Sequence, residues 1–127
     1  MKYNNEPYSR KIDKAWGYEM LYAPEDFPAV AKALYGRGGN RISFQYHEHK
    51  DEVLCLISGE AILWLENDNG RLEPHPMELS KGFRVVAGQK HRIQLVKDST
   101  ILEVSEHELD DTIRLSEEEF NKMSSKL

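Results

Sequence analysis

The hydrophobic and polar positions along the chain follow the period of β-strands. Short apolar runs recur about every eight to twelve residues and are separated by turn residues. The runs are WGYEMLY, VAKALY, EVLCLIS, AILWLE, FRVVA, HRIQLV and TILEVS. β-Branched or alternating runs of this length are typical of strands, and their close spacing is typical of a barrel or sandwich. The pattern predicts one all-β domain.

Breaks in this pattern divide the chain. Residues 1–14 are polar and without period, and we expect them to form an N-terminal arm or a loosely attached edge strand. The strand-like runs occupy residues 15–115, where RLEPHPM carries two prolines and is expected at a sheet edge. Residues 116–127 are predicted to form a C-terminal helix, because Ser116 and Glu119 have the spacing of a capping box.

The stretch RISFQYHEHKDEVLCLISGE concentrates the candidate chemistry. Strand alternation from Arg41 places Gln45, His47 and His49 on one face, which suits a chelating histidine pair. A third histidine, His91, follows a turn downstream. Imidazoles and carboxylates are common ligands of divalent transition metals. The pattern therefore predicts a metal site.

The acidic ligand is ambiguous on alternation alone. Continued alternation turns Asp51 inward with the histidines. For Glu52 to face the same side, the chain must bulge or turn at residues 50–51. Both carboxylates are therefore candidates at this point.

Composition excludes several classes of protein. The chain has 127 residues and a net charge of -5, and it lacks the basic stripe of a nucleic-acid-binding protein. It contains no apolar run of membrane-spanning length, so no membrane partner is expected. Cys55 is the one cysteine, which fits a reducing compartment and predicts a cytoplasmic protein.

Two motifs resemble those of the cupin superfamily. The first has the form H-x-H, then Glu, then six residues and Gly, and the second has the form G-x-x-H. They are met here by His47, His49, Glu52, Gly59, Gly88 and His91. The resemblance implies a double-stranded β-helix, or jelly-roll barrel, with a short C-terminal helix. It also implies His47, His49, Glu52 and His91 as metal ligands, and the spacing to Gly59 favours Glu52 over Asp51.

More narrowly, KAWGYE, RISFQYHEHKDE, VVAGQKHRI and LEVSEHELDDTIRL resemble single-domain cupins related to the C-terminal half of bifunctional mannose-6-phosphate isomerases. This resemblance implies aldose–ketose isomerisation of a sugar phosphate. Zinc, iron, manganese, nickel and cobalt all suit the ligands. Glu103 is the candidate base, although a solvent-facing strand residue is an alternative. Lys32 and Arg41 are candidates for phosphate binding or rim salt bridges, and Gln45 is a candidate for an outer-shell contact or for facing the polar cavity.

Two other functions fit the same residues. One is a non-catalytic cupin that binds a sugar or another small molecule with the help of the metal, and the other is an Fe(II)-dependent dioxygenase. A homodimer is expected, because EVLCLIS and AILWL offer more apolar surface than one small barrel encloses. The remaining histidines, His75 and His107, are expected to be surface or structural residues.

Overall fold

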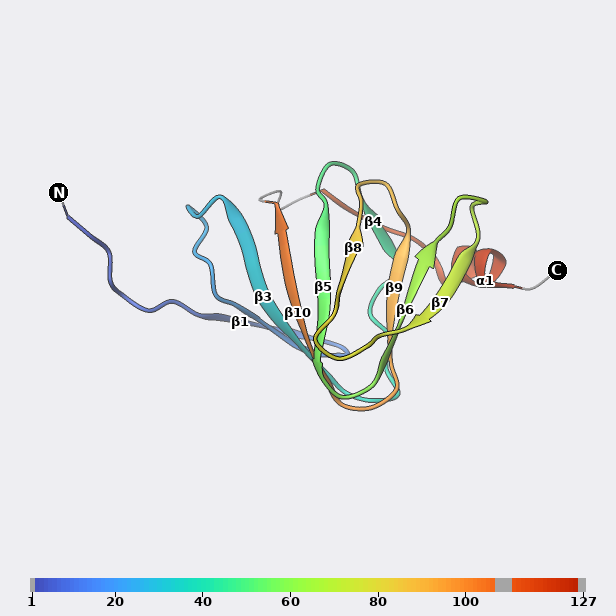
Figure 1. Ribbon diagram of the computed structural model, residues 1–127, viewed down its shortest axis with the longest axis horizontal. Coiled ribbons are helices and arrows are strands. Elements are labelled where there is room, and N and C mark those ends of the chain that lie inside the picture. Colours follow the sequence, from blue (N-terminus) through green and yellow to red (C-terminus); the bar gives the residue numbers. More distant parts are fainter. Residues whose placement is uncertain (1, 107–110, 126–127) are drawn as a thin grey trace.

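Two antiparallel sheets face each other in the molecule (Figure 1). The computed structural model describes residues 2–106 and 111–125, and this part of the chain forms eleven strands and one helix. The six-stranded sheet has the order β1 (Arg10–Lys14), β2 (Gly17–Leu21), β3 (Ala29–Gly36), β10 (Ser99–Glu106), β5 (Glu52–Ser58) and β8 (Gly82–Val85). The five-stranded sheet has the order β11 (Thr112–Arg114), β4 (Gln45–His47), β9 (His91–Leu95), β6 (Ala61–Glu66) and β7 (Leu72–Pro76).

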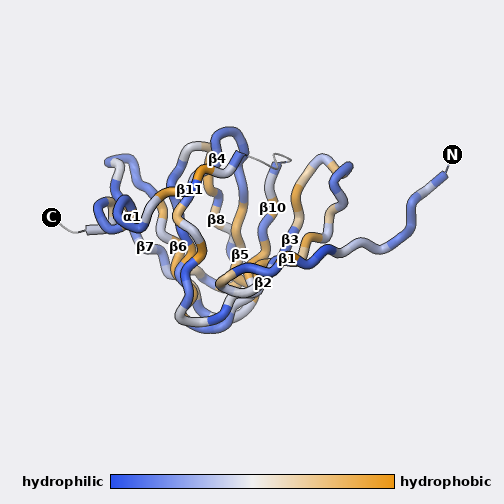
Figure 2. The backbone as a smooth tube through the Cα atoms, turned by 180° about the vertical axis from the view of Figure 1, so that it is seen from behind, coloured by the Kyte–Doolittle hydropathy of each residue, from blue (hydrophilic) through white to orange (hydrophobic). Residues whose placement is uncertain are grey.

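The main hydrophobic core lies between the sheets. It takes alternate residues from strands of both sheets, which is the pattern of an antiparallel sheet with one buried face. Its fully buried members include Leu54, Leu56, Leu63, Val85, Leu95 and Ile101. Figure 2 shows apolar segments along the strands and hydrophilic loops at their ends. Packing in this core fixes the positions of the strands whose ends carry the candidate site.

Most elements match the prediction from the sequence. Each apolar run forms a strand, and the proline-bearing β7 lies at the edge of its sheet. Residues 2–9 form no helix or strand and extend away from the barrel, whereas β1 pairs with β2 as an edge strand (Figure 1). The all-β barrel is thus confirmed.

Two local predictions were wrong. The alternating strand was expected to continue from Arg41 to His49, but β4 ends at His47 and the chain turns there. The run EVLCLIS is continuously apolar, which predicts a strand covered on both faces, but in β5 only alternate residues are buried. Val53 and Ile57, on the outer face, are 41% and 50% exposed in the single chain. The inner face alone supplies the core.

The C-terminal helix α1 (Glu117–Ser124) packs on the outer face of the five-stranded sheet. Ser116 caps it as predicted, because the Glu119 N–H donates to Ser116 Oγ at 3.1 Å. Phe120 anchors the helix in a second hydrophobic cluster with Phe44 and Leu72. No helix in residues 2–106 and 111–125 is long and apolar enough to cross a membrane.

Candidate metal centre

Three buried side chains converge inside the barrel. His47 ends β4, Glu52 begins β5 and His91 begins β9. Glu52 Oε1 lies 3.0 Å from His91 Nε2, and Glu52 Oε2 lies 3.4 Å from His47 Nε2. One ligand atom from each residue falls within 4.8 Å of the others. The structure thus brings together three of the four residues predicted as ligands.

The fourth, His49, lies elsewhere. Its side chain is 70% exposed, and its Nε2 lies 3.8 Å from a carboxylate oxygen of Glu48. The prediction assumed that alternation continues past His47, whereas residues 48–50 form a turn. That turn adds one residue to the alternation of inward and outward side chains, so that Lys50 is buried and His49 faces solvent.

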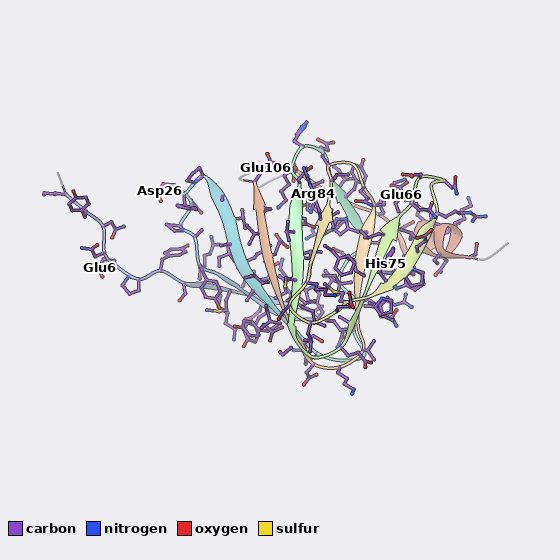
Figure 3. The ribbon with its side chains drawn as sticks, viewed as in Figure 1. Glu6, Asp26, Glu66, His75, Arg84 and Glu106 are labelled. Carbon is purple, nitrogen blue, oxygen red and sulfur yellow. The ribbon has the colours of Figure 1, made fainter. Side chains whose placement is uncertain are left out.

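The same turn separates the two candidate carboxylates. Glu52 is buried in the cluster. Asp51 lies at the barrel end instead, where it binds the guanidinium of Arg84 and accepts the Ala87 N–H at 2.9 Å. Arg84 projects at this end of the barrel (Figure 3). Glu52 is therefore the carboxylate that the fold presents to the histidines.

Within the described part of the chain, two buried polar atoms of the cluster lack a partner, which a cation could supply. Among the described residues, His47 Nε2 and Glu52 Oε2 have no hydrogen-bond partner, although both are buried. The Nδ1 of His91 lies 3.0 Å from the Gln89 carbonyl, which can only accept. With its Nδ1 protonated, a neutral His91 carries a lone pair on Nε2, which faces the Glu52 carboxylate. A divalent metal ion would satisfy these lone pairs together.

Electrostatics keep Glu52 in the form that binds a metal. Burial alone would raise the pKa of the Glu52 carboxyl. The contacts of this carboxyl with the imidazoles of His47 and His91 outweigh burial and hold the pKa of Glu52 well below its ordinary value. Carboxylates bind metals in the ionised form. The cluster therefore suits zinc, iron, manganese, nickel or cobalt.

A row of buried and partly buried charges lies on the neighbouring barrel wall. Lys32 Nζ is 3.0 Å from Glu19 and 3.6 Å from Glu103, and Lys50 Nζ is 4.0 Å from Glu103. Lys50 Nζ also donates to Ser105 Oγ at 3.4 Å. Glu103, expected as a base or a solvent-facing residue, is thus buried within an ion-pair network.

The pKa values of Lys32 and Glu103 are both raised, for different reasons. Burial opposes the charge of Lys32, but Glu103 and Glu19 outweigh it and raise the pKa of Lys32. For Glu103, burial and the charge of Glu52 outweigh the attraction of Lys32 and Lys50. The pKa values of both partners can be raised together because Lys32 has two carboxylate neighbours, whereas Glu103 is the more deeply buried partner.

The cluster and the charged wall line one cavity of about 710 Å³. Gln45 also lines it and accepts the Ser43 hydroxyl at 2.9 Å. Arg41 lines it too, is about half exposed, and lies 3.7 Å from Glu117. Apolar residues complete the lining, among them Trp16, Leu34, Ile42, Leu54 and Ile93. A cavity of this size and mixed polarity suits a small organic molecule.

Sequence reasoning missed two residues of the site. Lys50 follows the histidine pair directly, but its inward direction depends on the turn. Asp111 accepts N–H groups from that turn and is buried, yet it lies more than sixty residues further along the chain. No local pattern connects such distant residues. Of the other two histidines, His75 lies on the edge strand β7 (Figure 3), where its Nε2 is 3.6 Å from Glu73 and its ring centroid is 6.2 Å from that of Phe83, and His107 lies outside the described residues.

Comparisons with solved structures show the fold. Oxalate decarboxylase from Bacillus subtilis aligns with a TM-score of 0.76 at 16% identity, over 91% of this chain and 33% of that one. The chain thus spans about a third of oxalate decarboxylase. KdgF from Halomonas sp. aligns with a TM-score of 0.63 at 18% identity, over 74% of this chain and 81% of that one. CapF, a capsular polysaccharide assembling protein from Staphylococcus aureus, aligns with a TM-score of 0.72 at 14% identity, over 85% and 34%.

Comparisons of sequence add little. No family model matches the chain. An RNA-directed RNA polymerase from melon necrotic spot virus is 34% identical over 67 residues, which is 51% of this chain and 8% of the polymerase. So small a share of the polymerase carries no functional argument. By its architecture, the chain has the jelly-roll fold of the cupin β-barrels, with a His–Glu–His cluster placed to hold a divalent metal.

Proposed function

We propose that this metal-binding cupin is an aldose–ketose isomerase that acts on a sugar phosphate of the mannose 6-phosphate type. The observation that carries the proposal is that Glu103, a buried carboxylate, lines the same cavity as the His47–Glu52–His91 cluster. Isomerisation needs a base beside an electrophilic centre. A bound divalent cation would supply Lewis acidity to the sugar's oxygens.

In this proposal Glu103 moves the proton between the sugar's carbons. It takes the proton from C2 of the aldose and returns it to C1, while the hydroxyl proton passes from O2 to O1. A carboxyl with a raised pKa is suited to taking up and returning a proton, and burial raises the pKa of Glu103. Lys32 holds Glu103 in place through their ion pair.

The phosphate would bind at the exposed part of the cavity. Lys32 is already paired with both Glu19 and Glu103, so its charge is largely matched. Arg41 is half exposed and lies 3.7 Å from Glu117. We therefore favour Arg41 over Lys32 as the phosphate contact, with Gln45 contacting a sugar hydroxyl.

Hydrogen exchange at C2 tests the isomerase. The metal-loaded protein is incubated in D₂O with mannose 6-phosphate, whose C2 hydrogen is followed by NMR, or with fructose 6-phosphate, whose C1 hydrogens are followed instead. Glu103→Gln is expected to slow exchange by about 10² to 10⁴, the usual contribution of a positioned base. Glu118→Gln, which removes an exposed carboxylate from α1, is the control and should leave exchange unchanged. Absence of exchange with every sugar phosphate would exclude the isomerase.

The ligand set favours a second candidate, an Fe(II)-dependent dioxygenase. With His49 outside the cluster, two histidines and one carboxylate remain. That combination is the facial triad of non-haem Fe(II) oxygenases. Oxygen consumption by the Fe(II)-loaded protein with candidate organic substrates separates this function from isomerisation. Thermal stabilisation by a sugar without turnover would instead indicate a non-catalytic binding protein.

We propose a homodimer formed by the outer face of the six-stranded sheet. Val53 pairs with Val104 across β5 and β10, and Leu102 pairs with Cys55, so exposed apolar side chains form one stripe. A two-fold axis through such a stripe would bury it against itself. Val104→Lys should convert a dimer to a monomer in light scattering, whereas Val96→Lys, at an exposed position just after the end of β9, should not. A monomeric wild-type protein would exclude the dimer.

We also propose a cytoplasmic location. Cys55 is the one cysteine of the sequence, so the chain can form no internal disulfide. Such a chain is suited to a reducing compartment.

A further inference from the structure

The turn between β4 and β5 is held mainly by one distant residue, Asp111. The backbone N–H groups of His49 and Lys50 both donate to Asp111 Oδ2 at 3.0 Å. The Glu48 N–H donates to the main-chain carbonyl of Asp111 at 3.1 Å. Three consecutive amides therefore bind one residue. In a continuing strand, alternate amides would point to opposite sides.

These hydrogen bonds to Asp111 determine which side chains point into the barrel. Because the turn adds one residue to the strand's alternation, Lys50 and Glu52 follow His47 inward, while His49 and Asp51 face outward. The next amide, Asp51 N–H, is bound by Glu106 Oε1 at 3.0 Å, at the same end of the barrel (Figure 3). The turn is thus fixed by hydrogen bonds along its length.

The second oxygen of Asp111 faces the ligand His47. Asp111 Oδ1 lies 3.3 Å from His47 Nδ1 and has no hydrogen-bond partner among the described residues. Thr112 Oγ1 lies 3.2 Å from the same nitrogen. A carboxylate beside Nδ1 favours the tautomer with hydrogen there, which leaves the Nε2 lone pair free for a metal.

We infer that Asp111 is the positioning residue of the metal centre, because it holds the 48–50 turn that turns His49 outward and it orients His47 toward the ion. Asp111 itself does not contact the ion. This role depends on the proposed metal centre but is the same for an isomerase, an oxygenase or a binding protein.

The substitution Asp111→Asn separates the two roles of Asp111, which are to hold the turn and to orient His47. In Asp111→Asn, the amide oxygen can still accept the two turn amides, so the turn is retained. The amide NH₂ then replaces the oxygen that faces His47 Nδ1. Because NH₂ can only donate, it favours the His47 tautomer with a lone pair on Nδ1 and hydrogen on Nε2. That tautomer cannot bind the metal through Nε2.

Cobalt(II) titration monitored by its visible spectrum tests the inference. Asp111→Asn is expected to weaken Co(II) binding by about 10- to 100-fold, the usual effect of removing an outer partner of a ligand, with little change in Tm. The matched control is Asp98→Asn, since Asp98 also accepts a loop amide, Gly38 N–H at 2.8 Å, far from the centre. Asp98→Asn should leave Co(II) affinity unchanged. Equal affinity of Asp111→Asn and wild type would overturn the inference.

Asp111→Ala tests the hold on the turn. Amide hydrogen exchange at Glu48, His49 and Lys50 should accelerate in this variant, whether or not metal is present. Added to Asp111→Ala, His49→Ala should further weaken Co(II) binding, because the freed turn allows His49 to face the barrel. Unchanged exchange at all three amides would overturn the role in the turn. A wild-type protein that binds no Co(II) while these amides respond would reject the metal centre but not the hold on the turn.

Discussion

Alanine at either buried histidine is expected to lower the affinity of the protein for Zn(II) or Co(II) by more than about 100-fold. Loss of an outer partner of a ligand already costs 10- to 100-fold, so loss of the ligand itself should cost more. His47 and His91 each direct Nε2 at Glu52 from within the barrel, and both side chains are buried. Competition with a chelator of known affinity measures the change.

His49→Ala is the matched control for these variants. It removes the same chemical group, two residues along the chain from His47, but from a side chain that is mostly exposed. We expect its metal affinity to equal that of the wild type. A loss as large as that of His47→Ala would show that His49 binds the metal and that the turn rearranges when the ion enters. Circular dichroism of each variant checks that the barrel remains folded.

Phe120→Ala is expected to destabilise the protein by about 3 to 5 kcal/mol, the usual cost of truncating a buried phenylalanine. Phe120 is 4% exposed and meets Phe44 and Trp64 edge-on, with ring centroids 5.5 and 5.4 Å apart. An eight-residue helix has little stability of its own, so loss of this anchor should release α1 from the sheet. Urea unfolding measures the free energy.

Release of α1 would also uncover a buried cation. Arg92 donates to Glu117 at the start of the helix and to the Ile42 carbonyl, and its guanidinium lies 4.7 Å from the centre of the Phe120 ring. The control is Phe27→Ala, at a phenylalanine that is 52% exposed, which should change the stability by less than about 1 kcal/mol. Equal effects of the two variants would show that Phe120 does not anchor the helix.

The fold was predictable because its signals are local. Each strand is a short apolar run with turn residues at its ends, and the prolines of β7 mark a sheet edge. The cap of α1 depends on Ser116 and Glu119, which are three residues apart. The resemblance to cupins added the barrel architecture, which the solved structures share. Oxalate decarboxylase, KdgF and CapF are not mannose-6-phosphate isomerases, so the narrower resemblance remains a proposal.

The site was predictable only where it follows strand alternation or the cupin motif. His47 and His91 lie at strand ends with the expected inward direction, and Glu52 matches the motif spacing to Gly59. His49 was misplaced because alternation fails where the chain turns. That turn is set by hydrogen bonds to Asp111, far along the sequence. The inward direction of Lys50 has the same non-local cause.

The three converging residues come from both sheets of the barrel. His47 and His91 belong to the five-stranded sheet, and Glu52 belongs to the six-stranded sheet. An ion held by all three would act as a cross-link between the two layers, close to the turn that joins β4 to β5. Its departure would then loosen the barrel as well as empty the site, so that the metal content of a cell would set the protein's lifetime along with its chemistry.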